Sequence, residues 1–217
     1  MRKIKCIAVG PAAGRIMNKI ISSGLEKTDV IVIDTDPQAL NESLAKEKVF
    51  IDPPLKPEPL DTSYFSRPSK ERMAELRKMD EERFKEQNNI LHETVIASKE
   101  KIKAAFSGAD LIIIICCMGT AKGLVIAPEV AKIAKDMNIP AVAILSTPPS
   151  SEGNMRMGYA EEGINKIRQY IEAVRISDSN LISHRENAGT LTAKLRALVD
   201  EDMKKQVEHV ARFSQKL

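Results

Sequence analysis

The sequence predicts an α/β protein built on a doubly wound, mostly parallel sheet with helices on both faces. Short apolar runs alternate with segments of helical periodicity along the chain. Two of the runs, Leu111–Cys117 and Pro140–Leu145, are apolar at almost every position, as in the centre of a parallel sheet that is covered on both sides. With 217 residues, 43% of them hydrophobic and 29% charged, the chain is long enough for one full core. We therefore expect residues 1–217 to form a single domain.

The first part of the chain shows five elements before its pattern changes. Apolar runs bounded by turn residues predict strands, and apolar residues three or four positions apart predict helices. The expected elements, in order, are a strand at Ile4–Val9, a helix with Ile16, Ile20 and Ile21 on one face, a strand at Val30–Ile33, a short helix at Gln38–Ala45 and an edge strand at Lys48–Ile51.

The composition changes between about residues 53 and 87. Prolines recur from Pro53 to Pro68 and exclude regular structure there. The following segment, Ser69–Gln87, is densely charged and carries only a thin apolar stripe. This pattern predicts an exposed helical arm. It is consistent both with a solvated helix that has no partner and with an interaction surface.

The remainder of the chain returns to regular alternation. The expected elements are an amphipathic helix with Leu91, Val95, Ile102 and Phe106, a strand at Leu111–Cys117, a loop at Gly119–Gly123 with a helix to about Met137, a strand at Pro140–Leu145, a helix at Ala160–Tyr170, a strand at Ala173–Ile176, and a long C-terminal helix at about 190–214.

Composition excludes several classes of function. The net charge of +3 combines both signs along the chain, so we expect no nucleic-acid partner. No apolar run approaches the roughly 20 residues of a transmembrane helix, and the N-terminus has no cleavage site for a signal peptide. Cys6, Cys116 and Cys117 lie in apolar runs, which indicates buried free thiols in a cytoplasmic protein. No pattern of metal ligands or of catalytic residues is present.

Two loops are the candidate binding sites, because ligands of doubly wound sheets bind at the carboxyl ends of strands. The backbone N–H groups at the start of a helix favour a phosphate, and glycine allows close approach. The first loop comprises Gly10, Pro11, Ala12, Ala13, Gly14 and Arg15, and the second comprises Gly119, Thr120, Ala121, Lys122 and Gly123. A Rossmann-like NAD(P) site, with Asp34 on a ribose hydroxyl, remains an alternative, although Ala12 and Arg15 replace two glycines of its motif.

Several segments, taken together, resemble the FtsZ/tubulin family. Asp34–Leu40 is similar to the family segment NTDAQAL, and Phe106–Asp110 resembles the entry to its fourth strand. Ala127–Lys135 resembles AAPVVAEIAK. Glu152–Met157 and Ala160–Gly163 together resemble EGxxRMxxAEEG. Because the matches occur in the family's order, the chain is identified as similar to the family's nucleotide-binding domain over about residues 3 to 182.

The resemblance implies a guanine-nucleotide site whose phosphate loops are altered here. The family motif GGGTGTG aligns with Gly119–Val125, where Lys122 replaces a threonine, and GGGGGN aligns with the first loop, where Pro11 has no N–H to donate. Arg15 and Lys122 could bind phosphate in place of backbone N–H groups. Alternatively, they are solvated, or paired with Asp34 or Glu152, in a pocket that binds no nucleotide. GTP or GDP is therefore expected to bind weakly or not at all, with magnesium only when nucleotide is present.

The resemblance also assigns the base and sugar side of the site. Glu152 and Arg156 match family residues that contact the ribose and guanine. Asp178 replaces an asparagine, and because a carboxylate cannot donate to the purine, guanine selectivity is in doubt. Asp200, or Glu201 if the register differs by one residue, lies near the position that binds the guanine edge in the family.

These observations predict an FtsZ-like guanine-nucleotide-binding protein of the cell-division or cytoskeletal type, with little or no GTP hydrolysis. In the family, a loop after the long helix supplies the acidic residues for hydrolysis, and the sequence does not include it. The alternative is a pseudo-GTPase, an interaction or oligomerisation module that binds no nucleotide. Self-association or a cytoskeletal partner is expected in either case.

Overall fold

The computed structural model describes residues 2–24, 28–52, 70–185 and 192–216. Its strands are β1 (Ile4–Val9), β2 (Thr28–Asp34), β3 (Glu47–Phe50), β4 (Leu111–Cys117), β5 (Ala141–Thr147) and β6 (Ala173–Asp178). Its helices are α1 (Pro11–Ser22), α2 (Pro37–Glu42), α3 (Lys70–Ala97), α4 (Lys99–Phe106), the π-helical turn η1 (Lys122–Ile126), α5 (Ala127–Asp136), the 3₁₀ turn η2 (Ser150–Glu152), α6 (Asn154–Arg168), α7 (Ser179–Arg185) and α8 (Thr192–Gln215).

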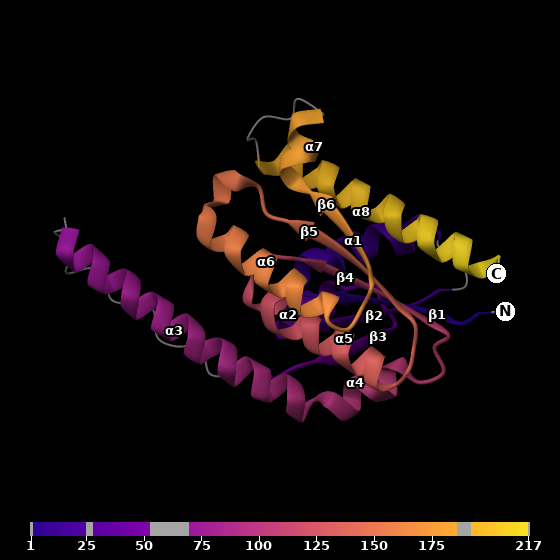
Figure 1. The fold of residues 1–217 in the computed structure, drawn as a ribbon. Coiled ribbons are helices and arrows are strands. Elements are labelled where there is room, and N and C mark those ends of the chain that lie inside the picture. The colour runs from indigo at the N-terminus through magenta and orange to yellow at the C-terminus, as the bar shows by residue number, and fades with distance from the viewer. Residues whose placement is uncertain (1, 25–27, 53–69, 186–191, 217) are drawn as a thin grey trace.

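The six strands form one parallel sheet in the order β3-β2-β1-β4-β5-β6 (Figure 1). From β1 to β3 the chain adds strands on one side of β1, and from β4 to β6 it adds strands on the other side. The strand order therefore reverses between β1 and β4, where Val9 lies opposite Cys116. The predicted doubly wound α/β class is confirmed, and the described strands are all parallel.

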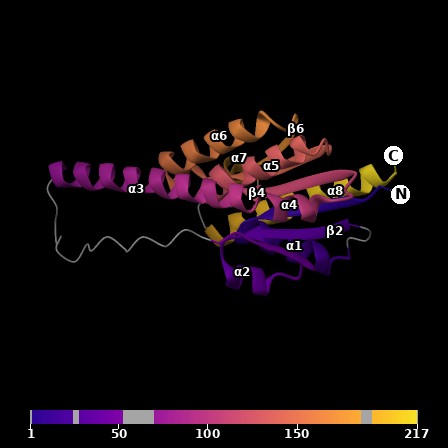
Figure 2. The ribbon, with the colours of Figure 1, turned by 90° about the horizontal axis from the view of Figure 1, so that it is seen from below.

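Side chains alternate along the central strands and divide the core into two layers. On β1, Ile7 and Val9 belong to the layer beneath α3, α4, α5 and α6, whereas Cys6 and Ala8 face α1 and α8. The helices lie on both faces of the sheet, as the alternating pattern predicts. Figure 2 shows α5 and α6 on the side of the sheet away from α1 and α2. The strands predicted to be central, β4 and β5, each lie between two neighbours.

The charged arm differs from the sequence-based prediction. The boundary expected near Gln87 is absent, because α3 continues without a break to Ala97. No glycine or proline occurs between Lys70 and Ala97, so nothing in the backbone ends the helix earlier. The proline-rich part of the predicted arm lies outside the described residues.

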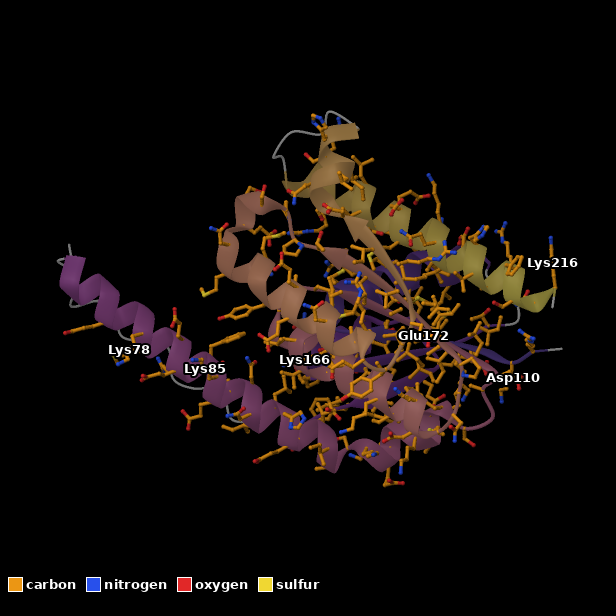
Figure 3. The ribbon with its side chains drawn as sticks, in the orientation of Figure 1. Lys78, Lys85, Asp110, Lys166, Glu172 and Lys216 are labelled. Atoms are coloured by element: carbon orange, nitrogen blue, oxygen red, sulfur yellow. The ribbon has the colours of Figure 1, made fainter. Side chains whose placement is uncertain are left out.

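The two halves of α3 have different surroundings. The ring of Phe84 stacks on Tyr159 of α6, with centroids 4.4 Å apart, and Leu91 and Val95 are buried in the core. The N-terminal half extends away from the sheet (Figures 1 and 2). Charged side chains such as Lys78 are distributed along it (Figure 3). The helix is thus anchored at one end and exposed at the other.

Three further features concern the rest of the chain. The helix α7 was not predicted from the sequence, and the long C-terminal helix is observed as α8. The cysteines are free thiols. Within the described ranges, no helix combines the length and apolar character that crossing a membrane requires.

Candidate functional site

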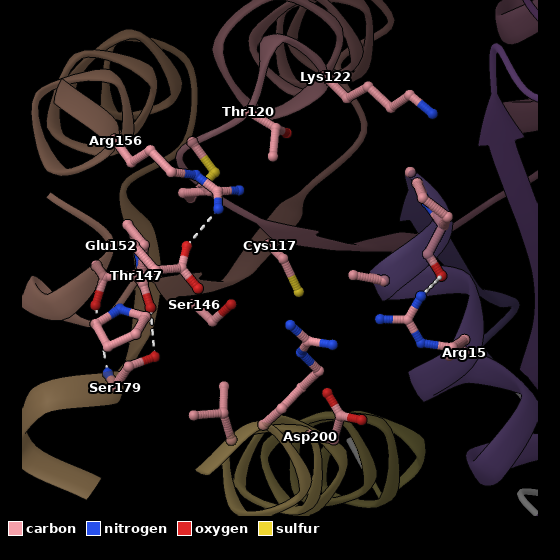
Figure 4. Close-up of a pocket in the computed structure, with 18 of the residues that line it drawn as sticks. Arg15, Cys117, Thr120, Lys122, Ser146, Thr147, Glu152, Arg156, Ser179 and Asp200 are labelled. Atoms are coloured by element: carbon pink, nitrogen blue, oxygen red, sulfur yellow. Dashed lines mark hydrogen bonds and ion pairs between the residues drawn. The ribbon is translucent and has the colours of Figure 1, made fainter. Parts of the chain in front are cut away.

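A cavity of about 480 Å³ lies at the reversal of strand order, between the carboxyl ends of β1, β4 and β5 and the side of α8 (Figure 4). This is where ligands bind in doubly wound sheets. It brings together most of the residues proposed from the sequence. Those that line it are Gly10, Pro11, Ala12, Arg15, Thr120, Ala121, Lys122, Glu152, Arg156 and Asp200.

Two helix N-termini meet at this cavity. Helix α1 starts directly after Gly10, with Pro11 as its first residue. The turn after β4 begins at Thr120, whose carbonyl accepts from the Leu124 N–H at 2.9 Å and whose hydroxyl accepts from the Gly123 N–H at 3.3 Å. The first N–H groups of each helix have no partner within the helix, so both ends favour an anion.

The glycines that remain in the second loop have steric reasons to be glycine. Gly119 has φ +85°, and a Cβ there would lie 3.0 Å from the carbonyl oxygen of Arg156 and from the ring of Pro148. A Cβ at Gly123 would lie 3.2 Å from the backbone of Met118. A side chain is therefore disfavoured by backbone conformation and packing at Gly119 and would crowd Met118 at Gly123, whether or not a phosphate binds.

The Lys122 side chain lines the cavity, and its amine pairs with Asp34, which lies outside the lining. Its amine donates to Asp34 Oδ1, and its methylene groups pack against Gly10. Asp34 is fully buried at the end of β2, and its second oxygen has no hydrogen-bond partner among the described residues. In Figure 4 the amine of Lys122 points away from Arg156 and Glu152. Lys122 is thus engaged by a carboxylate of the protein itself.

Glu152, Arg156 and Asp200 are paired in the same way. Arg156 bonds to Glu152 one turn earlier in the chain, and its Nε donates to the Gly119 carbonyl at 3.2 Å. Asp200 of α8 accepts from Lys19 of α1 at 2.8 Å. These pairs leave Arg15 as the predicted cation without a carboxylate partner in the described structure. Its guanidinium bonds only to the Pro11 carbonyl, at 3.5 Å.

Six of the predicted site residues do not line the cavity. Asp178 caps α7, because its Oδ1 accepts from the N–H groups of Asn180 at 2.8 Å and Leu181 at 3.3 Å. The other five either lie behind the loops or face the core: Ala13, Gly14, Asp34, Gly119 and Gly123.

Sequence reasoning missed several polar residues of the cavity. Cys117, Ser146 and Thr147 stand at the ends of β4 and β5, and Arg196 lies one helical turn before Asp200. Burial raises the pKa of the Cys117 thiol, while a hydrogen bond with Ser146 opposes that rise. The strand-end positions follow from the topology and could have been proposed. Among the described residues, no group of three or more His, Cys, Asp or Glu side chains is placed to hold a metal ion.

Known proteins resemble this chain over most of its length. Residues 3–184 match the model of the Tubulin/FtsZ family, GTPase domain. An FtsZ dimer from M. jannaschii is similar with a TM-score of 0.76 and 22% identity, covering 97% of this chain and 55% of that one.

Two other solved structures share the fold. CetZ2 from Haloferax volcanii, described as a GTPgS-bound protofilament, has a TM-score of 0.69 and 17% identity, with 97% of this chain and 58% of that chain covered. TubZ of Clostridium botulinum phage c-st has a TM-score of 0.59 and 18% identity, with coverages of 82% and 52%. The chain spans about half the length of these structures.

Proposed function

Because this chain belongs to the tubulin/FtsZ family, we propose that it is an FtsZ-like protein that binds GTP or GDP in the cavity between β1 and β4. One observation carries the proposal. The cavity joins the N-termini of two helices to Glu152, Arg156 and Asp200, so that groups suited to phosphate and groups suited to a nucleoside lie at one site. Such a protein would act in the cytoplasm, in cell division or in a related cytoskeletal process.

We further propose that hydrolysis is slow or absent. Pro11 removes one N–H donor from the first loop, and Lys122 is held by Asp34 instead of by a phosphate. Transition-state stabilisation in phosphoryl transfer depends on donors that already point at the transferring group. Magnesium would enter only with a nucleotide.

A pseudo-GTPase is the second candidate, and the ion pairs of the cavity favour it. Three potential ligand-binding groups, Lys122, Arg156 and Asp200, already have partners of opposite charge. In this case the chain would act through its surface, with the exposed half of α3 as the site of self-association. The NAD(P) alternative is weaker, because Asp34 is buried, is bound by Lys122 and does not line the cavity.

Isothermal titration with GTP, GDP, ATP and NADP, combined with a phosphate-release assay, separates these functions. Micromolar binding of guanine nucleotides without turnover supports the first proposal. A chain that binds none of the four but forms a stable dimer supports the pseudo-GTPase. Turnover comparable to that of an active GTPase would contradict the proposed lack of hydrolysis.

A further inference from the structure

The charges around the cavity do not balance. Its titratable lining comprises four cations, Arg15, Lys122, Arg156 and Arg196, and two carboxylates, Glu152 and Asp200. Lys122 and Arg156 are neutralised by neighbouring carboxylates, and Asp200 is neutralised by Lys19 from outside the lining.

Arg15 and Arg196 are the cations that remain. Both are exposed, and neither forms an ion pair with a described residue.

Both arginines line the same cavity. Arg15 extends from the second turn of α1, and Arg196 from the second turn of α8, the helix that packs against α1. Burial and the carboxylate of Asp200 raise the pKa of the Cys117 thiol, whereas both arginine charges lower it. In Figure 4 Arg15 points toward the space between Cys117 and α8. Two guanidinium groups that have no ion-pair partner among the described residues therefore line the cavity near the end of β4.

We infer that Arg15 and Arg196 form an anion-binding clamp above Cys117 that holds a phosphoryl group between α1 and α8. Each guanidinium offers several N–H donors, and the planar fork matches the oxygens of phosphate. The two side chains carry the same charge and line one cavity, so an anion between them would interact favourably with both. A bound phosphoryl group also satisfies the free donors.

The clamp changes what the cavity selects. Asp200, expected to bind the guanine edge, lies one turn beyond Arg196 and is already bound by Lys19. The α8 side of the cavity can therefore hold an anion, and its donors add to those of the Gly119–Gly123 turn. The inference deepens the proposed function, on which it rests for a phosphorylated ligand, but it does not require guanine.

Pyrophosphate is the direct probe, because it carries the phosphoryl chemistry without a base. We expect titration calorimetry to show pyrophosphate binding to the full chain and alkylation of Cys117 to slow when pyrophosphate is present. Arg15→Gln and Arg196→Gln should each weaken binding by about tenfold or more, as expected for the loss of a charge-assisted bond. Lysine at either position should restore part of the affinity.

The matched control is Arg168→Gln, which removes an exposed arginine near the end of α6, outside the cavity lining. It should leave pyrophosphate affinity unchanged. Circular dichroism melting of each variant confirms that all are folded. Wild-type protein that does not bind millimolar pyrophosphate, or binding that both glutamine variants retain in full, would overturn the clamp.

Parallel titrations with GDP and guanosine separate this inference from the proposed function. If pyrophosphate binds through the two arginines but GDP binds no more tightly, the clamp stands and the guanine-nucleotide function fails. If GDP binds equally well to wild type and to both glutamine variants, the function stands and the clamp fails.

Discussion

The amine of Lys122 donates to the buried carboxylate of Asp34, 88 positions earlier in the chain, and the lysine stem packs against Gly10 on the way. The resemblance to the FtsZ/tubulin family places a threonine at the position of Lys122 and an asparagine at the position of Asp34. Two charges of opposite sign therefore stand where two neutral residues are expected, and they neutralise each other. The pair links the loop after β4 to the end of β2 and passes directly by the first phosphate loop.

The two residues of this pair should contribute unequally to stability. Lys122→Met leaves the fully buried Asp34 carboxylate without its cation and with only the Asp36 N–H bonded to it, and we expect the free energy of unfolding to fall by about 3 kcal/mol. Asp34→Asn should cost less, because the lysine side chain is 23% exposed and can turn to solvent. The double variant should lose less than the sum of the two. Urea denaturation measures all three, and additive losses would show that the pair is not coupled.

Release of Lys122 should also strengthen anion binding. In Asp34→Asn the amine is free to turn back toward the cavity, so we expect the affinity for GTP or pyrophosphate to rise several-fold, with a steeper dependence on salt. Asp29→Asn, which removes an exposed carboxylate from β2, is the matched control and should leave affinity unchanged. Equal affinity in the two variants would show that Lys122 is too distant to reach the ligand.

Gly119 and Gly158 should respond in opposite ways to alanine. At Gly119 the added Cβ meets Pro148 and the Arg156 carbonyl at 3.0 Å, and the positive φ adds strain, so we expect a loss of about 1–3 kcal/mol. At Gly158, inside α6, a Cβ meets nothing within 4 Å, and alanine should stabilise by roughly 0.5–1 kcal/mol. Thermal melting of the two variants tests both signs. A neutral Gly119→Ala would mean that the loop relaxes freely.

The fold could be predicted from sequence because its central strands carry their own signal. Leu111–Cys117 is apolar at every position, and a strand of this kind is stable only where helices cover both faces of the sheet. The uninterrupted length of α3 was not predicted, because the charged segment has too few apolar residues to show a helical periodicity. Its helical state comes instead from the absence of breakers and from the anchoring of its C-terminal half in the core.

Less of the candidate site than of the fold could be predicted from the sequence. The two loops could be found because topology fixes where ligands bind. Arg196 was missed because an exposed arginine on an amphipathic helix has the pattern of any solvated face. Asp178 was placed in the site by resemblance, but the structure shows it capping α7, because a carboxylate before a helix finds N–H donors nearby. The Glu152–Arg156 pair follows from its i,i+4 spacing. The Lys122–Asp34 and Lys19–Asp200 pairs instead depend on tertiary contacts that no spacing encodes.

Thiol reactivity should distinguish the cysteines. Burial raises the pKa of Cys6 to about 12 and that of Cys116 well above its usual value, so neither forms appreciable thiolate at pH 8 in the folded protein. Cys117 is less buried and has a smaller rise, and we expect it alone to react with a thiol reagent, more slowly than a free cysteine and faster as the pH increases. Labelling in denaturant should detect all 3 cysteines. Rapid labelling of two or more in the native state would contradict this burial.

The exposed side of α3 should mediate the proposed self-association. Met79 and Ile90 are 44% and 41% exposed and lie eleven positions apart, close to three full turns, so they share one face of the helix. The N-terminal half of α3 stands away from the sheet, and a helix without packing is only marginally stable in water. Pairing with a second copy would cover this face.

We therefore expect the wild-type chain to dimerise at micromolar concentration. The double substitution Met79→Glu with Ile90→Glu should make it monomeric, because it places charge on the face that pairs. Lys78→Glu changes the net charge of the same helix by the same amount on a neighbouring face, and it should preserve the dimer. Sedimentation velocity or light scattering measures the mass. A wild-type monomer, or a dimer that survives the double substitution, would exclude this face of α3 as the contact.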